Sequence, residues 1–309
     1  MELLARFGTP HQKERWLQPL LNGEIRSCFA MTEPDVASSD PTNLAATIVR
    51  QGPMYVVNGH KWWTTGATDP RCQLILFLGR GPNAEHSDST HRRHTCHSIV
   101  LIPMKSRGVR LIRHLTVMGY DDAPHGHAEM EYRNVTVPMA EALLLGEGRG
   151  FEAAQSRLGG GRLHHCMRAV GFAERALELM IDRATARKAF DRNLSQFDSV
   201  LQFIAESRCD IEQGRHAVLR AAASVDNGDM RSARRDVAVA KIVVPRLVHN
   251  VIDRAVQVHG ALGVSQDTVL AAMLAMTRSL RLADGPDEVH LVTVANMELR
   301  TRRKSLAKL

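Results

Sequence analysis

The chain has 309 residues, of which 44% are apolar and 24% charged, a composition typical of a globular protein with one large or two modest domains. No run of eighteen apolar residues occurs, so the sequence predicts no transmembrane helix. The net charge of +7 is spread along the chain apart from clusters at 91–94 and 300–304, and no nucleic-acid-binding motif accompanies it. We therefore expect no nucleic-acid partner.

The five cysteines are widely spaced and form no CxxC pair, which favours free thiols in a reducing compartment and argues against a structural metal site. The first residues, 1–7, include Glu2 and do not resemble a secretory signal. We expect a cytoplasmic location if the source is bacterial, and a mitochondrial or peroxisomal one if it is eukaryotic.

The first half of the chain predicts a short helix and then β structure. Residues 10–22 place Trp16, Leu17, Leu20 and Leu21 on one side of a helix that Asn22-Gly23 ends. The run 55–57, then Asn58-Gly59, then 60–63 predicts a β-hairpin, because Asn-Gly suits a type I′ turn.

Further strands are predicted by short apolar or alternating runs between turn signals. These runs are 74–78, 98–102, 127–132 and 135–137. The polar, His-rich stretch 79–95 predicts a long exposed loop between two of them.

The pattern changes at 146–150, after which apolar residues recur at helical spacing. The predicted helices are 151–188, 197–226, 231–259, 267–282 and 287–303. Pro245 falls inside the third and predicts a kink there. Long helices with short breaks are typical of an up-and-down bundle.

Three ordered stretches resemble the acyl-CoA dehydrogenase family. The stretch 29–40, FAMTEPDVASSD, is similar to the TEPxxGSD signature of that family, and 58–66, NGHKWWTTG, is similar to its NGxKxWxTxG motif. The C-terminal half adds 187–190, 257–260 and 281–290, which are most similar to the branch containing family members ten and eleven.

The resemblance implies an α+β fold with a middle β-barrel domain followed by a C-terminal four-helix bundle. It places a remnant of an N-terminal helical domain at 1–26, the middle β domain at 27–148 and the bundle at 149–309. Most of the N-terminal helical domain of the family is expected to be absent. In the family this domain closes one side of the acyl pocket, so we expect the chain alone to have poor catalytic turnover.

The family chemistry implies that FAD oxidises an acyl-CoA to a trans-2-enoyl-CoA, as in fatty acid β-oxidation. The resemblance places Asp284 as the base that removes the α-proton. From the residues alone, Asp284 is interpreted as a helix-end residue before the Gly285-Pro286 stop, and only the resemblance makes it the base. Arg162 and Gly285 are implied on the substrate side.

Around the flavin, the resemblance implies roles for Phe29, Thr32 and Ser38, with Ser38 also near the substrate. Without it, Thr32 and Ser38 simply cap a turn at Pro34. Trp63 and Thr65 are two apart, so they share one face of a strand and are implied beside the isoalloxazine.

Other cofactor contacts are implied to come from a partner subunit. Arg187 and Phe190 are three apart on a predicted helix and share a face, and Arg187 suits the FAD pyrophosphate, with a solvated surface arginine as the alternative. The remaining implied cofactor residues are Gln257, Gly260, Pro286 and Glu288. His164 and His165 are interpreted as core or surface histidines.

The implied partners are an acyl-CoA, electron-transferring flavoprotein as electron acceptor, and further subunits in a homodimer or homotetramer. Two alternatives stay open. One is an acyl-CoA oxidase that passes electrons to oxygen, and the other is a truncated, catalytically impaired subunit that assembles with full-length homologues.

Overall fold

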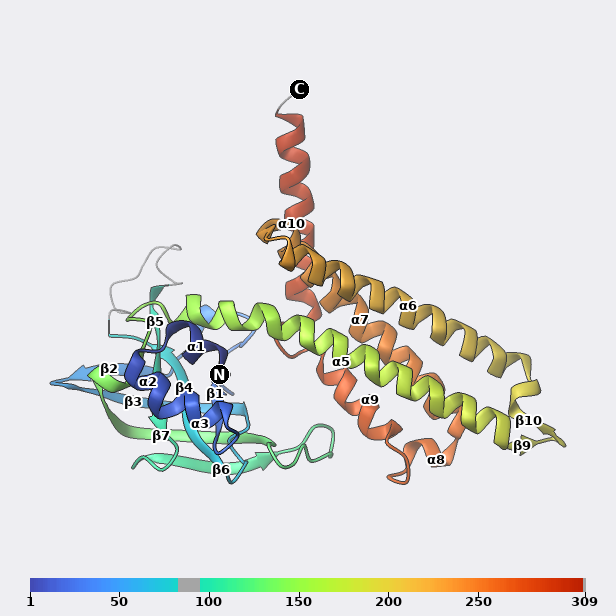
Figure 1. Cartoon of the computed structure of the whole chain (residues 1–309), viewed down its shortest axis with the longest axis horizontal. Coiled ribbons are helices and arrows are strands. Elements are labelled where there is room, and N and C mark those ends of the chain that lie inside the picture. The colour runs from blue at the N-terminus through green and yellow to red at the C-terminus, as the bar shows by residue number, and fades with distance from the viewer. Residues whose placement is uncertain (83–94, 308–309) are drawn as a thin grey trace. The chain divides into compact units, whose positions relative to one another are not determined.

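The computed structural model describes residues 1–82 and 95–307, and the chain forms two compact units, Met1–Arg157 and Leu158–Leu309 (Figure 1). Each unit has its own hydrophobic core, and each is described by itself. Helix α5, Gly150–Ala186, begins in the first unit. None of the described helices is long and apolar enough to cross a membrane. The sequence-based boundaries at 26 and 148 stay predictions.

The first unit opens with short helical segments. These are α1 (Glu2–Phe7), α2 (Pro10–Gln12), the π-helical turn η1 (Lys13–Leu17) and α3 (Gln18–Leu21). Thr9 and Gln12 form a reciprocal capping box, and Gly23 follows the last turn at φ 76°. The predicted helix 10–22 is therefore confirmed. Of its four apolar residues Leu20 is buried, whereas Leu21 is exposed.

Eight strands form one sheet within the described part of this unit. They are β1 (Arg26–Ala30), β2 (Thr47–Gln51), β3 (Met54–Thr65), β4 (Cys72–Arg80), β5 (His97–Pro103), β6 (Val109–Leu115), β7 (His127–Pro138) and β8 (Leu143–Leu144). The order is β6-β7-β3-β2-β4-β5-β8, and β1 pairs in parallel with β4. Helix α4 (Met139–Ala142) joins β7 to β8, and the 3₁₀ turn η2 (Pro41–Asn43) precedes β2.

The predicted strands 74–78 and 98–102 are confirmed as a buried antiparallel pair, β4 and β5, and 127–137 is one strand, β7. The predicted loop 79–95 begins later than expected, because β4 continues to Arg80. The rest of that prediction, 83–94, lies outside the described residues.

The hairpin predicted at Asn58-Gly59 is wrong. Strand β3 runs through both residues, and the turn lies earlier, at Gly52 (φ 58°), where β2 meets β3. Asn58 Oδ1 instead accepts a hydrogen bond of 2.7 Å from the backbone N–H of Asn134 on β7. Gly59 is required by packing, since a Cβ there would lie 2.4 Å from Cβ of Ala46.

The second unit is helical. Its elements after α5 are the strands β9 (Lys188–Ala189) and β10 (Arg192–Asn193), the 3₁₀ turn η5 (Leu194–Gln196), α6 (Asp198–Asp226), α7 (Met230–His259), α8 (Ala261–Val264), α9 (Leu270–Ser279) and α10 (Asp287–Leu306). Four of the five predicted helices are confirmed almost to their ends, whereas 267–282 shortens to α9. Buried residues of α5, α6, α7 and α9 share one core. Helix α7 continues through Pro245 without being divided.

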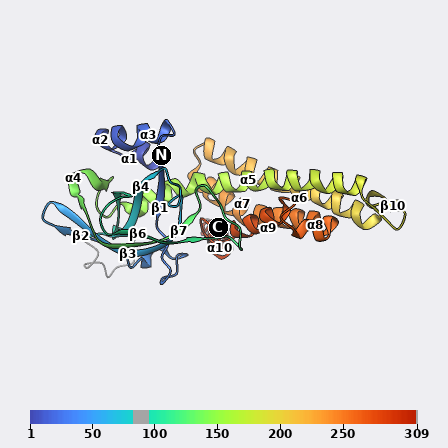
Figure 2. The same cartoon turned by 90° about the horizontal axis from the view of Figure 1, so that it is seen from below.

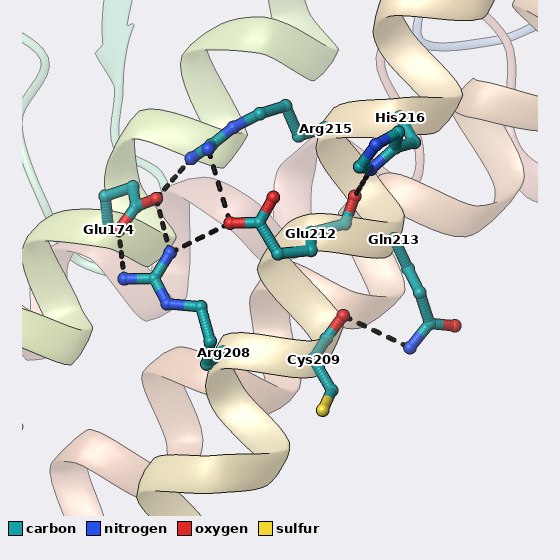
Figure 3. Close-up of polar contacts among 7 residues, drawn as sticks. All are labelled: Glu174, Arg208, Cys209, Glu212, Gln213, Arg215 and His216. Carbon is teal, nitrogen blue, oxygen red and sulfur yellow. Dashed lines mark hydrogen bonds and ion pairs between the residues drawn. The ribbon is translucent and has the colours of Figure 1, made fainter.

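Ion pairs connect α5 to α6 on the surface of the bundle (Figure 3). Arg208 Nη1 and Nη2 donate to the two oxygens of the Glu174 carboxylate, at 2.9 and 3.0 Å, and Arg215 pairs with the same carboxylate. Glu212 bridges the two arginines from within α6. Because these side chains are partly exposed to solvent, each ion pair is expected to contribute little to stability.

Candidate functional site

The two motifs of the first unit are joined by a buried ion pair. Lys61 Nζ on β3 donates to Glu33 Oε1 at 2.7 Å, and also to the carbonyls of Met31 (2.8 Å) and Leu78 (2.7 Å). Burial lowers the pKa of Lys61 to about 8, while the Glu33 charge opposes that shift.

The same carboxylate orders the loop that follows β1. Glu33 accepts hydrogen bonds from the backbone N–H groups of Ala45 (2.7 Å) and Ala46 (3.1 Å). The Trp62 N–H donates to the Thr32 carbonyl at 3.0 Å, so Thr32 lies directly against the strand that carries Trp63. The TEP and KWW segments, thirty residues apart in sequence, thus form one surface.

A bulge in β3 displays the expected flavin residues. The β3–β7 register shifts between Lys61 and Thr64, and Trp63 adopts φ 49° within the shift. Trp63 is 39% exposed and Thr65 is exposed, whereas Thr64 between them is buried. Trp63 and Thr65 are therefore both on the solvent-exposed side of the strand, as their spacing predicts. The bulge lies at the same position and contributes to this exposure pattern.

His127 contacts both of these residues and was not identified from the sequence. It is the cross-strand partner of Thr65, whose Oγ1 lies 2.8 Å from His127 Nδ1. The ring centroids of Trp63 and His127 are 5.3 Å apart. Burial lowers the pKa of His127, which favours its neutral form at pH 7. Its position at the start of a strand, after Gly126, gives no sequence signal for this role.

Phe29 and Ser38 flank the same loop. Phe29, on β1, packs against the core that contains Leu74 and Leu76. The Ser38 hydroxyl is buried and has no hydrogen-bond partner among the residues that the structure describes. A buried, unsatisfied hydroxyl is costly unless a ligand completes it, so Ser38 fits the expected phosphate or substrate contact.

In the second unit, Asp284 lies in the turn between α9 and α10. Its backbone is left-handed at φ 57°, followed by Gly285 at φ 105°, and its side chain is 14% exposed. Arg162 Nε of α5 donates to the Asp284 carbonyl at 2.9 Å. The expected base and the expected substrate arginine are thus brought together across 122 residues of sequence. Burial lowers the pKa of Arg162, and the Asp284 charge counteracts this.

The Asp284 carboxylate lies against α5. A Cβ on Gly161 would be 3.2 Å from Asp284 Oδ2, and His165 Nε2 lies 3.2 Å from the same oxygen. Arg168 Nη2 donates to His165 Nδ1 at 3.1 Å. His165, which the sequence indicated only as a core or surface histidine, is partly buried and lies beside the expected base. One turn of helix separates it from Arg162, a spacing that could have indicated the shared face.

Buried polar groups fix the turn that contains Asp284. Lys241 Nζ on α7 donates to the carbonyls of Leu280 (2.6 Å) and Ala283 (2.8 Å). Asp287, at the start of α10, accepts from Arg246 (3.1 Å) and Arg281 (2.9 Å). These contacts constrain the backbone on both sides of Asp284, which is the condition for keeping an unfavourable φ in place.

The other expected cofactor residues divide into two groups. Pro286 is the N-cap of α10 next to Asp284, and Glu288 is exposed in the first turn, where it lines a groove with Arg234. Gln257 and Gly260 are exposed at the C-terminal end of α7. Figures 1 and 2 show α8 and the β9–β10 hairpin at the same end of the bundle, whereas the turn with Asp284 follows the other end of α9.

Arg187 and Phe190 do not share a helical face, which corrects the expectation from their spacing. Helix α5 ends at Ala186, and Phe190-Asp191 form the two-residue turn between β9 and β10. Both have positive φ, 51° and 63°, as a type I′ turn requires. Phe190 is 90% exposed, and Arg187 is exposed nearby.

Comparison with known proteins supports one family. Residues 28–135 match the acyl-CoA dehydrogenase middle domain, and 148–299 match the acyl-CoA dehydrogenase C-terminal domain. The chain is 52% identical over 307 residues to acyl-CoA dehydrogenase family member 11 of Homo sapiens, covering 99% of this chain and 39% of that protein. It is 50% identical over 308 residues to the probable acyl-CoA dehydrogenase FadE2 of Mycobacterium tuberculosis, covering 99% and 74%.

A solved structure of an acyl-CoA dehydrogenase candidate from Mycobacterium abscessus superposes with a TM-score of 0.92 at 46% identity. That match covers 97% of this chain and 72% of the other. The chain spans only about two fifths of the length of the human relative.

Proposed function

The chain belongs to the acyl-CoA dehydrogenase family, and we propose that it dehydrogenates an acyl-CoA to a trans-2-enoyl-CoA with FAD. The α+β arrangement of a middle β domain and a C-terminal helical domain is that of the family. The observation that carries the proposal is Asp284, a largely buried carboxylate held in a left-handed turn by Arg162.

Asp284 is proposed as the base. An α-proton beside a thioester is weakly acidic, so it requires a carboxylate that is shielded from water and fixed in position. In the proposed step a carboxylate oxygen takes the α-proton, the α-carbon electron pair forms the double bond, and the β-hydrogen leaves as hydride. Arg162 and Gly285 are proposed to contact the substrate near the thioester.

FAD would supply the hydride acceptor. The residues present fit such a group, because the Ser38 hydroxyl is buried without a partner in the described chain, and Trp63 and Thr65 face solvent side by side. Phe29, Thr32, Ser38, Trp63 and Thr65 would hold it from this chain. Pro286 and Glu288 adjoin Asp284 and are proposed as further contacts.

A partner subunit is proposed to complete the cofactor site. Arg187, Phe190, Gln257 and Gly260 are exposed at the end of the bundle that lies away from Asp284. Exposed arginine and phenylalanine side chains suit contacts to a diphosphate and a planar ring of another subunit. A homodimer or homotetramer follows, with electron-transferring flavoprotein as the proposed electron acceptor.

The test begins with the purified chain and a flavin spectrum. Anaerobic mixing with straight-chain acyl-CoAs of several lengths is expected to bleach the flavin, and the Asp284→Asn variant is expected to bind flavin and acyl-CoA without bleaching. Bleaching of Asp284→Asn at the wild-type rate contradicts the assignment of the base. Hydrogen peroxide in air indicates an oxidase, and a colourless protein indicates a non-catalytic subunit.

A further inference from the structure

Lys241 is a buried cation whose contacts converge on one short segment of the second unit. Its side chain extends from α7 and is 1% exposed. The ammonium donates to the Leu280 carbonyl at 2.6 Å and to the Ala283 carbonyl at 2.8 Å. A buried charge is costly unless hydrogen bonds replace those it made with water, so the ammonium and these two carbonyls fix each other's positions.

The segment that Lys241 contacts is the irregular end of α9. Leu280 is the C-cap of this helix. Beyond it, the backbone N–H groups of Leu282 and Ala283 share the Ser279 carbonyl, at 2.9 Å each. The last carbonyls of a helix have no partner within the helix, and a cation is favoured at its negative, C-terminal end. Lys241 therefore supplies, from another helix, both donors and charge to the end of α9.

The residue that follows this segment is the proposed base. Asp284 has φ 57°, a left-handed conformation that is unfavourable for any residue other than glycine. Arg162 donates to the Asp284 carbonyl at 2.9 Å, and Lys241 donates to the preceding carbonyl, that of Ala283. Two cations, from α5 and α7, thus hold the two peptide groups on either side of the Asp284 Cα. Because peptide groups are planar, their orientations determine φ and ψ of Asp284 and the direction of its side chain.

The ammonium is also within electrostatic reach of the base. Burial lowers the pKa of Lys241, the nearby Arg162 adds to that effect, and the carboxylates of Asp284 and Asp287 are among the charges that oppose it. The attraction between Lys241 and Asp284 is mutual, so it favours a turn that stays close to α7. Because the hydrogen bonds of the ammonium go to backbone carbonyls, its effect on Asp284 is chiefly on position.

We propose that Lys241 is a positioning residue which, together with Arg162, fixes the peptide groups on both sides of Asp284 and so directs the carboxylate at the α-proton of the acyl-CoA. The inference rests on the proposed function, in which Asp284 removes that proton. Lys241 acts through the backbone, and only Asp284 meets the reacting atoms. A base displaced by about 1 Å loses on the order of 100-fold in rate, so the effect falls on proton removal rather than on acyl-CoA binding.

The test measures anaerobic flavin bleaching and acyl-CoA binding in the flavin-loaded chain, with octanoyl-CoA as the probe. Lys241→Met keeps most of the side-chain volume but removes the ammonium. The bleaching rate is expected to fall ~100-fold, while the dissociation constant of octanoyl-CoA changes less than about threefold. The control is Arg254→Met, which removes another cation of α7. Arg254 pairs with α6, at 2.7 Å from Asp210 and 3.0 Å from Glu206, and its loss should leave the bleaching rate within about twofold of wild type.

A double variant tests whether Lys241 acts through Asp284. Lys241→Met in the Asp284→Asn background is expected to slow bleaching no further than Asp284→Asn alone, because the base that Lys241 positions is already lost. Wild-type bleaching in Lys241→Met, or additive losses in the double variant, overturn the inference while leaving the proposed function standing. Wild-type bleaching in Asp284→Asn overturns the assignment of the base and the inference with it.

A second measurement is independent of the cofactor. Hydrogen–deuterium exchange of the flavin-free chain, followed by mass spectrometry, reports the opening of the turn through peptides that cover 279–287. In Lys241→Met these amides are expected to exchange about tenfold faster than in wild type, whereas Arg254→Met keeps the wild-type rate there. Unchanged exchange at 279–287 in Lys241→Met contradicts the inference. Faster exchange throughout the second unit also contradicts it, since Lys241 would then support the whole bundle rather than the turn.

Discussion

Lys61 Nζ lies 2.7 Å from Glu33 Oε1, and both side chains are buried, with 0% and 4% exposed. Each belongs to a motif that resembles a flavin-binding signature, yet both point into the first unit rather than outward. Their pairing is what fixes the loop with Thr32 against the strand with Trp63. Two of the most recognisable polar residues therefore have a structural role.

Breaking this pair is expected to be costly. Lys61→Met leaves the Glu33 charge buried without its counter-ion, which should reduce the free energy of unfolding by ~3–5 kcal/mol. Urea denaturation measures the change. The double variant Lys61→Met with Glu33→Gln should lose less than the sum of the singles. Arg110→Gln, which breaks an exposed pair with Glu131, serves as the control and should cost about 1 kcal/mol or less. A similar small loss in Lys61→Met contradicts the prediction.

Gly59 and Gly171 form a matched pair of glycine tests. Gly59→Ala places a methyl group 2.4 Å from Cβ of Ala46, so overpacking should destabilise the first unit by ~1–3 kcal/mol. Gly171, in α5, is exposed with open space around it, and Gly171→Ala should stabilise the helix by up to about 1 kcal/mol. Opposite shifts of the thermal midpoint are expected. A neutral Gly59→Ala contradicts the prediction and indicates that the chain at Ala46 can move away from β3.

Phe190 combines strain with exposure. A phenylalanine at φ 51° in a type I′ turn is unfavourable, and glycine there should stabilise the fold by about 1 kcal/mol. The exposed ring is proposed to contact the cofactor of another subunit, so Phe190→Gly should also weaken FAD binding. Calorimetry and flavin titration measure the two effects. Unchanged FAD affinity removes Phe190 from the proposed site, and Leu201→Ala, at an exposed apolar residue of helix α6, controls for simple loss of apolar surface.

His165 should influence the ionisation of Asp284. Arg168 donates to His165 Nδ1, so the imidazole proton lies on Nε2, 3.2 Å from the carboxylate oxygen. His165→Ala removes this polar neighbour of the carboxylate and should move the acid limb of the pH–rate profile to higher pH. The neighbouring His164→Ala, at an exposed position, should leave the profile unchanged.

Stability should depend on pH through His290. Burial, with the positive charges of Arg162 and Lys241, lowers the pKa of His290 to about 4, against about 6.5 in an unfolded chain. Between these values the unfolded state binds the extra proton, so the free energy of unfolding falls as the pH drops from 6.5 to 4. His290→Gln should flatten this dependence in urea titrations at pH 7 and 5. An unaltered slope would mean that other buried histidines account for it.

Much of the architecture could be predicted from the sequence because the relevant signals are local. The helices from α5 to α10 follow from apolar residues at helical spacing, and β4 and β5 from continuous apolar runs. Asp284 could be located, although only the ordered motifs upstream gave it a catalytic meaning.

Where local sequence signals gave a wrong prediction, long-range packing explains the observed structure. Asn58-Gly59 has the composition of a turn, but pairing with β7 keeps it inside a strand, and Ala46 makes glycine necessary there. Phe190 lies beyond the end of α5 because the chain reverses into β9–β10.

By itself the sequence determined the helices, most strands and the place of Asp284 between the last two helices. Only the tertiary structure decided that Lys61 neutralises Glu33, that His127 contacts Trp63 and Thr65, and that Arg162 and His165 lie beside Asp284. The physical reason is distance along the chain. Propensity and periodicity act over a few residues, whereas these contacts join residues 28 to 122 positions apart and exist only after the sheet and the bundle have formed.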